Sequence, residues 1–433
     1  MCAGYKHYDA LLDIATHGAN VSLSSPLPRQ SMPPANHKSA HDRYSILVGN
    51  VRKEQDTWRC IVLDADILEI WKEVHISPFR VVDKRELGPS SGRTIHDLSF
   101  PVGHSLNDYT NTSVICSPTF ERCDAIAVEI LRLQEAHPDT EIKQRAGDVA
   151  TAFRNVCIQS RRAFLFGGWL ERDNALVIDT SAAFGWSGSP ATYDIVGGAI
   201  AYVHGNSTTN QQPDGMFNYY SVDDHINVAA DIGSNCNDAE QSLRLAMTTI
   251  LGPTAVNEDK FTSWKTRQKA LGLIFDTVAG TVSMPAAQIT KAAACVNAAY
   301  RATLLSRTDY RSLLGRLRHV ATCVRLARAF LQRLRQQERH LHHRWGRQEI
   351  SWWVIILRSP LLNGVPIDYF HSNPAPDVCV EMDASDSVQC ALVAEDRRIL
   401  RYAFSEVERG LILSTNTDPT VGFDMNYREL LSC

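Results

Sequence analysis

The sequence predicts an α+β fold in which strand-rich and helix-rich stretches occupy different parts of the chain. Before residue 288, strand-like arms recur on both sides of turns rich in Gly, Pro and Ser, which is typical of antiparallel hairpins. Residues 288 to about 345 instead have apolar residues at three- and four-residue steps, which predicts helices, and strand-like stretches return from Val378. The 433 residues suffice for about three domains.

Cysteine usage and hydropathy predict where the protein resides. The eleven cysteines are scattered from Cys2 to Cys433, without a CxxC pair or zinc spacing, which is typical of free thiols in a reducing compartment. The chain opens without an apolar signal segment and has no apolar run of about 18 residues. We therefore predict an intracellular protein, cytoplasmic or nuclear, that does not span a membrane.

The first elements follow from composition and turn signals. Residues 22–43 are rich in Ser, Pro and polar residues, so residues 1–43 are predicted to be a flexible lead-in, with order beginning near Tyr44. "RCIVLDADILEIWKEV" predicts an apolar strand and a short helix. Residues 77–100 predict a hairpin whose first arm ends at Lys84 and whose second arm begins at Arg93.

Apolar periodicity predicts the later elements. Residues 123–137 have apolar residues spaced for one helix face, and residues 188–205 predict a helix with Pro190 in its first turn. The others are a strand in "RAGDVATAF", a hairpin around "RRAFLFGGWLERDNALVI", a helix in "DAEQSLRLAMTTILG", strands in "ALGLIFDT", "VCVEMDAS", "QCALVAED" and "ILRYAFS", and a last helix containing "YRELL".

Two adjacent aspartates, Asp223 and Asp224, interrupt the strand-like stretch "YYSVDDHINVAAD" (219–231). Aspartate is depleted in strands, and adjacent like charges repel each other. A turn in which the pair caps a helix or faces solvent is one explanation. A site that binds cations is the other.

Three further features bear on that choice. "GDVATAF" places Asp148 at the end of a predicted strand, with Phe153 five residues later, and "FGWSGSPATY" (184–193) is a glycine-rich turn that leads into a helix. Lys84 and Arg93 lie on facing arms of the predicted hairpin. Each feature alone also has a structural explanation: an Asx turn, a tight connection and two solvated cations.

In this order along the chain, the motifs resemble those of reverse transcriptases. "GDVATAF" resembles the family's first palm motif, "FGWSGSPA" resembles the next, and "SVDD" stands where the family has Tyr-x-Asp-Asp. "NEDKFTSWKTRQKALGLIFDT" resembles the following Lys-bearing segment and the primer-grip turn. "RTIHDLSFPVGHSLND" is similar to the fingers of long-terminal-repeat and DIRS-like retrotransposons, and "YRSLLGRLRHVATCVRLARAFLQRL" to their thumb. The resemblance covers roughly residues 75 to 433.

The resemblance implies a right-hand polymerase with fingers, a palm of antiparallel sheet and helices, and a helical thumb, followed by a partial ribonuclease H-like α/β domain. The implied boundaries are 1–43 for the lead-in, 44–145 for the fingers and N-terminal palm, 146–285 for the palm with the catalytic motifs, 286–347 for the basic thumb, 348–376 for a connection, and 377–433 for the truncated ribonuclease H-like domain.

The resemblance also implies residue roles. Asp148, Asp223 and, less directly, Asp224 would bind two Mg²⁺ or Mn²⁺ ions, whose charge offsets the repulsion between carboxylates. The implied nucleotide contacts are Lys84 and Arg93 at the triphosphate, Phe153 as a steric gate against a ribose 2′-hydroxyl, Phe184 and Gly185 as the floor, and Lys260 near the leaving pyrophosphate as its acid. Two residues depart from the pattern: Ser221 replaces the Tyr that packs against the primer end, and Ala183 replaces a Pro.

The segment 301–347 has twelve arginines and only two acids, Asp309 and Glu338. An arginine-rich helical face is commonly just solvated, but this bias is large in a chain that carries a net charge of −4. We therefore favour contact with the backbone of a nucleic-acid duplex. The predicted contacts are Arg325, Arg328 and Arg333.

The C-terminal stretches "EMDAS", with Asp383, and "NYRELL", with Glu429, resemble the start of a ribonuclease H domain. The chain stops four residues after Glu429, before further carboxylates of such a site, and other nearby acids lie on segments with no reason to converge. We therefore expect no ribonuclease H activity, and easy proteolysis beyond about residue 375.

The expected function is that of an RNA-directed DNA polymerase of a retroelement, a nucleotidyltransferase that extends a primer on an RNA or DNA template with deoxynucleoside triphosphates. The alternative is a catalytically decayed, non-enzymatic nucleic-acid-binding remnant. Ser221 and the early C-terminus favour the remnant, whereas the intact carboxylates, Lys84 and Arg93 favour the enzyme. A third interpretation is a metal-dependent phosphoesterase that uses the same carboxylates.

Overall fold

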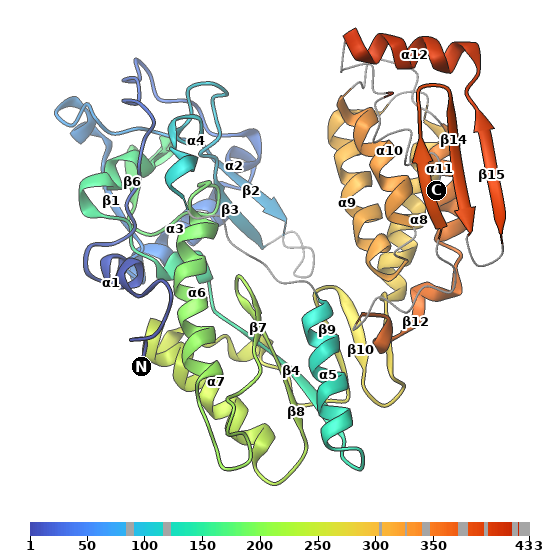
Figure 1. Cartoon of the computed structure of the whole chain (residues 1–433). Helices are drawn as coiled ribbons and strands as arrows, with labels where there is room; N and C mark the ends of the chain where they lie inside the picture. The colour runs from blue at the N-terminus through green and yellow to red at the C-terminus, as the bar shows by residue number, and fades with distance from the viewer. Residues whose placement is uncertain are drawn as a thin grey trace. The chain divides into compact units, whose positions relative to one another are not determined.

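A computed structural model describes residues 1–83, 91–115, 123–302, 305–324, 327–339, 347–370, 380–393, 397–417 and 423 (Figure 1). The chain divides into two compact units, Met1–His371 and Ser372–Cys433. The helices are α1 (Tyr8–His17), α2 (Lys38–Asp42), α3 (Tyr44–Asp56), α4 (Leu106–Tyr109), α5 (Asp124–Ala136), α6 (Ser189–Gly205), α7 (Asn235–Leu251), α8 (Ala286–Arg301), α9 (Arg307–Cys323), α10 (Arg328–Arg339), α11 (Arg347–Ile356) and α12 (Glu406–Thr417). The strands are β1 (Cys60–Asp64), β2 (Phe79–Asp83), β3 (Gly92–His96), β4 (Ile142–Asp148), β5 (Gly167–Leu170), β6 (Ala175–Asp179), β7 (Tyr219–Ser221), β8 (Asp224–Ala230), β9 (Arg267–Ala270), β10 (Leu273–Asp276), β11 (Thr281–Ser283), β12 (Asn363–Pro366), β13 (Val380–Ala384), β14 (Val388–Val393) and β15 (Arg398–Ala403). Within the described ranges, every helix is too short or too polar to cross a membrane.

The central sheet has the strand order β4-β8-β7, and both pairings are antiparallel. Alternate residues of a strand point to opposite faces, so Ile226 and Val228 of β8 pack in one core with Ile126 and Ile130 of α5. The intervening Asn227 points the other way, where its amide bonds to a side chain of α6. Helices therefore pack on both faces of the strands that end at the aspartates.

The N-terminal part contains the antiparallel sheet β1-β6-β5 and the hairpin β2–β3. Leu47 and Val51 of α3 pack in one core with Phe79 of β2 and Val177 of β6. The hairpin predicted over residues 77–100 is confirmed, with Val82 opposite Arg93. Lys84 follows β2 directly and lies outside the described residues.

Residues 1–43, which the sequence predicts to be a flexible lead-in, instead form α1 and α2 and pack against later segments. Ala19 and Val21 are buried in the same core as Val156 and Ile158. Gln30 donates from its side-chain amide to the Ile76 carbonyl and accepts from the Ile76 amide. The prediction was wrong because a few buried apolar residues and such polar contacts fix a segment whose composition is mostly polar.

Helices α8, α9, α10 and α11 share a core that includes Tyr310, Leu317, Val320, Leu334 and Trp353. The helices predicted from residue 288 to about 345 are thus confirmed over the described part of that range. The stretch "ALGLIFDT", predicted as one strand, contains a turn at Leu271 and Gly272 that joins β9 to β10. Both turn residues have positive φ angles, +52° and +78°.

The second unit contains the antiparallel sheet β13-β14-β15 and helix α12. The three strands match the predicted ones. Helix α12 was not predicted, and the predicted helix with "YRELL" lies outside the described residues.

A buried hydrogen-bonded histidine lies between the central sheet and α6 and α7. The Asn227 amide nitrogen donates to the Phe217 carbonyl and also approaches His204 Nε2 at 2.8 Å, so this ring nitrogen accepts. His204 Nδ1 therefore carries the proton and donates to Ser242 Oγ at 2.9 Å. Burial lowers the pKa of His204 to about 4, which agrees with a neutral ring.

This neutral ring predicts a loss of stability in acid. Because the folded pKa of about 4 lies below the unfolded value of 6.5, the stabilisation is present above pH 6.5 and is lost as the pH falls toward 4. In equilibrium urea titrations, His204→Gln should reduce the fall in unfolding free energy between pH 7 and pH 5 by about 2 kcal/mol. The exposed His17 supplies the control substitution, and an unchanged pH dependence in His204→Gln would contradict the prediction.

Candidate active site

Three carboxylates lie at one end of the central sheet. Asp148 ends β4 and stands opposite Asp224, the first residue of β8. Asp223 precedes it in the β7–β8 turn, and its carbonyl accepts from the Val149 amide at 2.8 Å. Val222 adopts a φ of +58°, which costs energy for a β-branched residue and is typical of functional sites. The aspartates therefore sit at a turn and not inside a strand.

Polar side chains from the segment before β9 close around Asp148. Asp148 is 2% exposed, and its carboxylate accepts from Asn257 Nδ2 at 2.5 Å and from Lys260 Nζ at 2.6 Å. The same ammonium lies 3.9 Å from an oxygen of Asp223, so one cation bridges the two carboxylates. The two carboxylate oxygens can be no farther apart than the sum of these two distances to Lys260. Asn257 was not predicted, because an isolated Asn carries no motif.

Burial and neighbouring negative charge raise the pKa values of Asp223 and Asp224. Burial, followed by the charges of Asp223 and Asp148, raises the pKa of Asp224 to about 6. Burial and the Asp148 charge also raise the pKa of Asp223, although Lys260 and Arg93 oppose them. Positive charge is therefore favourable at this end of the sheet.

A buried tyrosine lies beside the carboxylates. Tyr193 of α6 is 1% exposed, and among the described residues its hydroxyl has no hydrogen-bond partner. Burial and the charges of Asp223 and Asp148 raise its pKa, so the phenol stays protonated. Its ring lies 5.9 Å from that of Phe153, which connects the acidic end of the sheet to an aromatic cluster.

Four of the predicted nucleotide-contacting residues belong to this cluster. The Phe153 and Phe184 rings lie 5.0 Å apart, and the Arg93 guanidinium lies 5.9 Å from the Phe184 centroid. Gly185 has a φ of +132°, and a Cβ at this position would lie 2.1 Å from the His96 carbonyl oxygen, so only glycine fits. The structure thus brings Arg93, Phe153, Phe184 and Gly185 together.

The donor set suits Mg²⁺ or Mn²⁺. Mg²⁺ is commonly bound by one or two carboxylates and completes its coordination with substrate phosphates and water. The raised carboxylate pKa values and the bridging ammonium of Lys260 indicate a position where a cation is stabilised. Over the described part of the chain, no group of three or more His, Cys, Asp or Glu side chains is arranged to hold a metal ion. A cation at this site would therefore need ligands from substrate phosphates and water as well.

The tyrosines before the turn point away from the carboxylates. Tyr219 is buried in the core beneath the sheet, and the Tyr220 hydroxyl donates to Asp194 Oδ1 of α6 at 3.0 Å. Ser221 stands opposite Asp224 in the register. A smaller side chain thus occupies the position for which the resemblance implies a tyrosine.

A cationic cavity of about 480 Å³ lies where α9 and α10 meet the β9–β10 turn. Exposed Arg318, Arg328 and Arg335 line it. Arg328 is the one predicted duplex contact whose side chain the structure describes, and it lines this cavity. Arg325 lies outside the described residues, and the side chain of Arg333 is not described. Arg311 instead pairs with Glu338 at 2.7 Å.

In the second unit, Asp383 lies on β13 with an exposed side chain whose Oδ1 accepts from the Ala384 amide at 2.9 Å. Its predicted partner Glu429 lies outside the described residues.

No protein-family model matches the sequence, and comparison with curated proteins finds no match. Among solved structures, the fold is similar to foamy viral protease-reverse transcriptase. The dRH form in complex with double-stranded DNA matches with a TM-score of 0.50 and 13% identity, over 97% of this chain and 62% of that one. The complex with an RNA/DNA hybrid matches with a TM-score of 0.52 and 12% identity, over 97% of this chain and 48% of that one. A complex with double-stranded DNA matches with a TM-score of 0.52 and 12% identity, over 94% of this chain and 78% of that one. The predicted α+β fold is thus confirmed as a reverse transcriptase fold, and the chain spans 62% of the first of these structures.

Proposed function

We propose that the chain is an RNA-directed DNA polymerase that adds deoxynucleotides to a primer 3′ end by two-metal nucleotidyl transfer. The observation that carries this proposal is the convergence of Asp148 and Asp223, from separate strand ends, on the one ammonium of Lys260. Divalent cations bound there would stabilise the attacking oxygen and the triphosphate charge. The likeness to foamy viral reverse transcriptase at the level of fold supports the same chemistry.

Each side chain then has a distinct task. Asp148, held by Asn257, and Asp223 orient the cations, and Asp224 adds negative charge. Lys260 exchanges its carboxylate contacts for oxygens of the triphosphate, where it can protonate the leaving pyrophosphate. Arg93 offers a planar fork to the phosphates, and the Phe153 ring fills the space that a 2′-hydroxyl needs.

The source of the chain is proposed from the fingers motif. "RTIHDLSFPVGHSLND" is similar to DIRS-like and long-terminal-repeat retrotransposons, so we assign the polymerase to a retroelement. The proposal does not include ribonuclease H activity.

Primer extension tests the proposal directly. With a poly(rA) template, an oligo(dT) primer, dTTP and Mg²⁺ or Mn²⁺, the chain should lengthen the primer. Binding of the primer–template without extension would instead establish the decayed nucleic-acid-binding remnant. Cleavage of phosphoesters without extension would establish the phosphoesterase.

The cavity arginines are expected to bind the duplex backbone. Replacing Arg318, Arg328 and Arg335 by Ala should weaken primer–template affinity equally for unrelated sequences. The slope of log affinity against log salt should fall by about one unit per lost phosphate contact. Arg311→Ala, which removes a cation already paired with Glu338, is the matched control and should leave the slope nearly unchanged. An unchanged slope in the triple variant would show that these arginines are a solvated face.

A further inference from the structure

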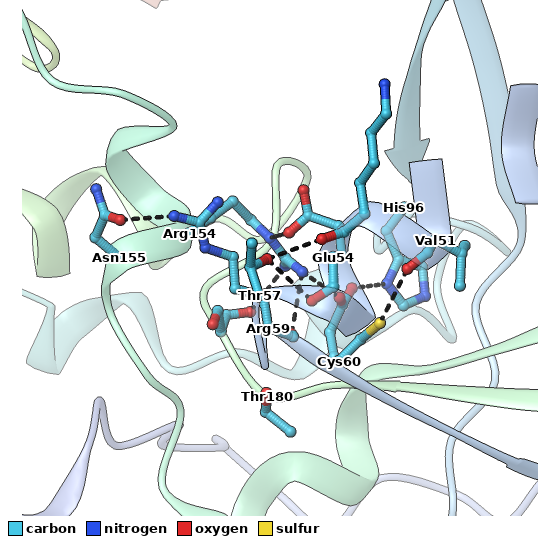
Figure 2. A network of polar contacts seen from close by, with 12 residues as sticks. Val51, Glu54, Thr57, Arg59, Cys60, His96, Arg154, Asn155 and Thr180 are labelled. Carbon is cyan, nitrogen blue, oxygen red and sulfur yellow. Dashed lines mark hydrogen bonds and ion pairs between the residues drawn. The ribbon is translucent and has the colours of Figure 1, made fainter. Parts of the chain in front are cut away.

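A cluster of charged residues, most of them buried, surrounds Arg154, and Figure 2 shows it with Glu54 and His96 labelled. Its members are Arg154, Asp179 and His96, which are 7%, 7% and 4% exposed, together with the partly exposed Glu54. They come from the 3₁₀ helix Ala152–Asn155, β6, β3 and α3. Four segments that are distant in the sequence therefore meet at one set of charges.

Arg154 is the central residue of the cluster. Its guanidinium donates to Glu54 Oε2 at 3.0 Å, to the Ser181 carbonyl at 3.1 Å, to the Arg59 carbonyl at 3.2 Å and to Asp179 Oδ1 at 2.6 Å. This fork holds four partners in fixed directions, which a flexible ammonium could not do.

Asp179 is held from two sides, by Arg154 and by His96. Its second oxygen is 2.9 Å from His96 Nδ1, and His96 Nε2 is 3.0 Å from the Gly167 carbonyl oxygen. Burial alone would raise the pKa of Asp179, but Arg154 and His96 lower it, so this carboxylate is ionised. Both ring nitrogens of His96 thus face oxygens that only accept, so the ring connects β6 to β5 through Asp179 and Gly167.

Each buried charge is connected to a nucleotide-contacting residue. His96 and Arg93 lie three residues apart on β3 and point to opposite faces, one buried and one exposed. Arg154 directly follows Phe153. The strand that ends at Asp179 leads to Phe184 and Gly185, and the His96 carbonyl lies against Gly185 so closely that no Cβ fits.

We propose that His96, Asp179 and Arg154 are positioning residues that set the spacing of Arg93, Phe153 and Phe184 around the incoming nucleotide. This inference rests on the proposed polymerase function. In this role the cluster acts through the three segments that it joins and not by direct contact with substrate. It holds three segments in one geometry, and small displacements of substrate-contacting groups have large kinetic effects.

Two measurements test the inference, and the first can be made whether or not the chain has polymerase activity. In native-state hydrogen exchange of the full chain, His96→Gln should accelerate exchange together in residues 92–96, 152–155 and 179–185. Acceleration confined to residues 92–96 would overturn the proposal even if the chain polymerises nothing. This result is independent of whether the proposed function holds.

Single-nucleotide incorporation supplies the second measurement. In His96→Gln and Asp179→Asn, KM for the deoxynucleotide should rise about 10-fold while kcat and primer–template affinity stay within about 3-fold. Arg154→Lys, which keeps the charge and loses the fork, should give an intermediate KM. Asp231→Asn, which alters contacts with Lys143 and Cys236 and none with the cluster, is the control.

Two outcomes overturn the proposal in an active chain. An unchanged KM in folded His96→Gln would show a purely structural cluster, and so would a fall in kcat at constant KM. If the buried substitutions prevent folding, Glu54→Gln removes one negative charge that faces Arg154 and Arg59 at the partly exposed edge of the cluster, and the same KM criterion then applies. Absence of extension by the unsubstituted chain would instead refute the proposed function.

Discussion

Asp223→Asn is expected to abolish primer extension, with a loss of at least about 10³-fold in rate, or about 4 kcal/mol. Asp223 is one of two carboxylates that share Lys260, and an amide oxygen binds a divalent cation far more weakly than a carboxylate does. Loss of this one charge should therefore remove cation binding without moving the backbone. Single-turnover extension at saturating primer–template and nucleotide measures the effect.

The same substitution should not unfold the protein. Burial and the Asp148 charge raise the pKa of Asp223, so its ionised form is disfavoured in the folded chain, and a neutral amide relieves that repulsion. Thermal unfolding should therefore occur at the same or a higher temperature. Asp231→Asn, just beyond the other end of β8, is the matched control and should retain extension. Full extension by a folded Asp223→Asn variant would refute the metal-binding role.

Phe153→Ala is expected to admit ribonucleotides. The Phe153 ring is half-buried and packs 5.0 Å from Phe184 and 5.9 Å from Tyr193, so its removal opens space on the side where Arg93 and Phe184 lie. The ratio of kcat/KM for deoxy- over ribonucleotide should fall by about 10- to 100-fold, which is typical of a pocket that has lost a filling group. Competing incorporation of dTTP and UTP opposite a poly(rA) template gives this ratio.

Truncation of a second aromatic residue distinguishes an effect on nucleotide selection from an effect on protein stability. Phe164 is also a half-buried aromatic residue, packed between two cores away from the carboxylates. Phe164→Ala should lower stability as Phe153→Ala does, and it should leave the nucleotide ratio unchanged. If Phe153→Ala also leaves the ratio unchanged, Phe153 is a core aromatic residue and not a steric gate.

Local patterns in the sequence pointed to parts of the site that lie at strand ends or in turns. Asp223 and Asp224 stood out because they interrupt a strand-like stretch, Asp148 because it ends a predicted strand, and Gly185 because a glycine-rich turn precedes a helix, and the resemblance to reverse transcriptases joined them into one site. The hairpin with Arg93 followed from its two strand-like arms and turn residues. In each case the signal lies within about ten consecutive residues, where periodicity and turn chemistry are informative.

The remaining parts depend on contacts between distant residues. Asn257 bonds to Asp148 across 109 positions, and His96 bonds to Asp179 across 83. Neither pair has a local pattern, because each residue is suited to its partner and not to its neighbours in the chain. Tyr193 likewise looks like one more apolar-face residue of α6 until the carboxylates are placed beside it. Long-range polar pairing is what the single sequence could not provide.

The docking of the first residues implies an order of events during synthesis. Asn36 bonds to Trp169 and Glu171, which lie 133 and 135 positions further along, so its partners leave the ribosome roughly 7 to 30 seconds later at ordinary translation rates. Throughout that interval the segment must remain soluble and unpaired. A stretch rich in Ser and Pro with few apolar side chains suits such a wait, because it offers little surface for aggregation. The composition that predicted disorder thus matches the state of this segment in the nascent chain, while the finished protein holds it in place.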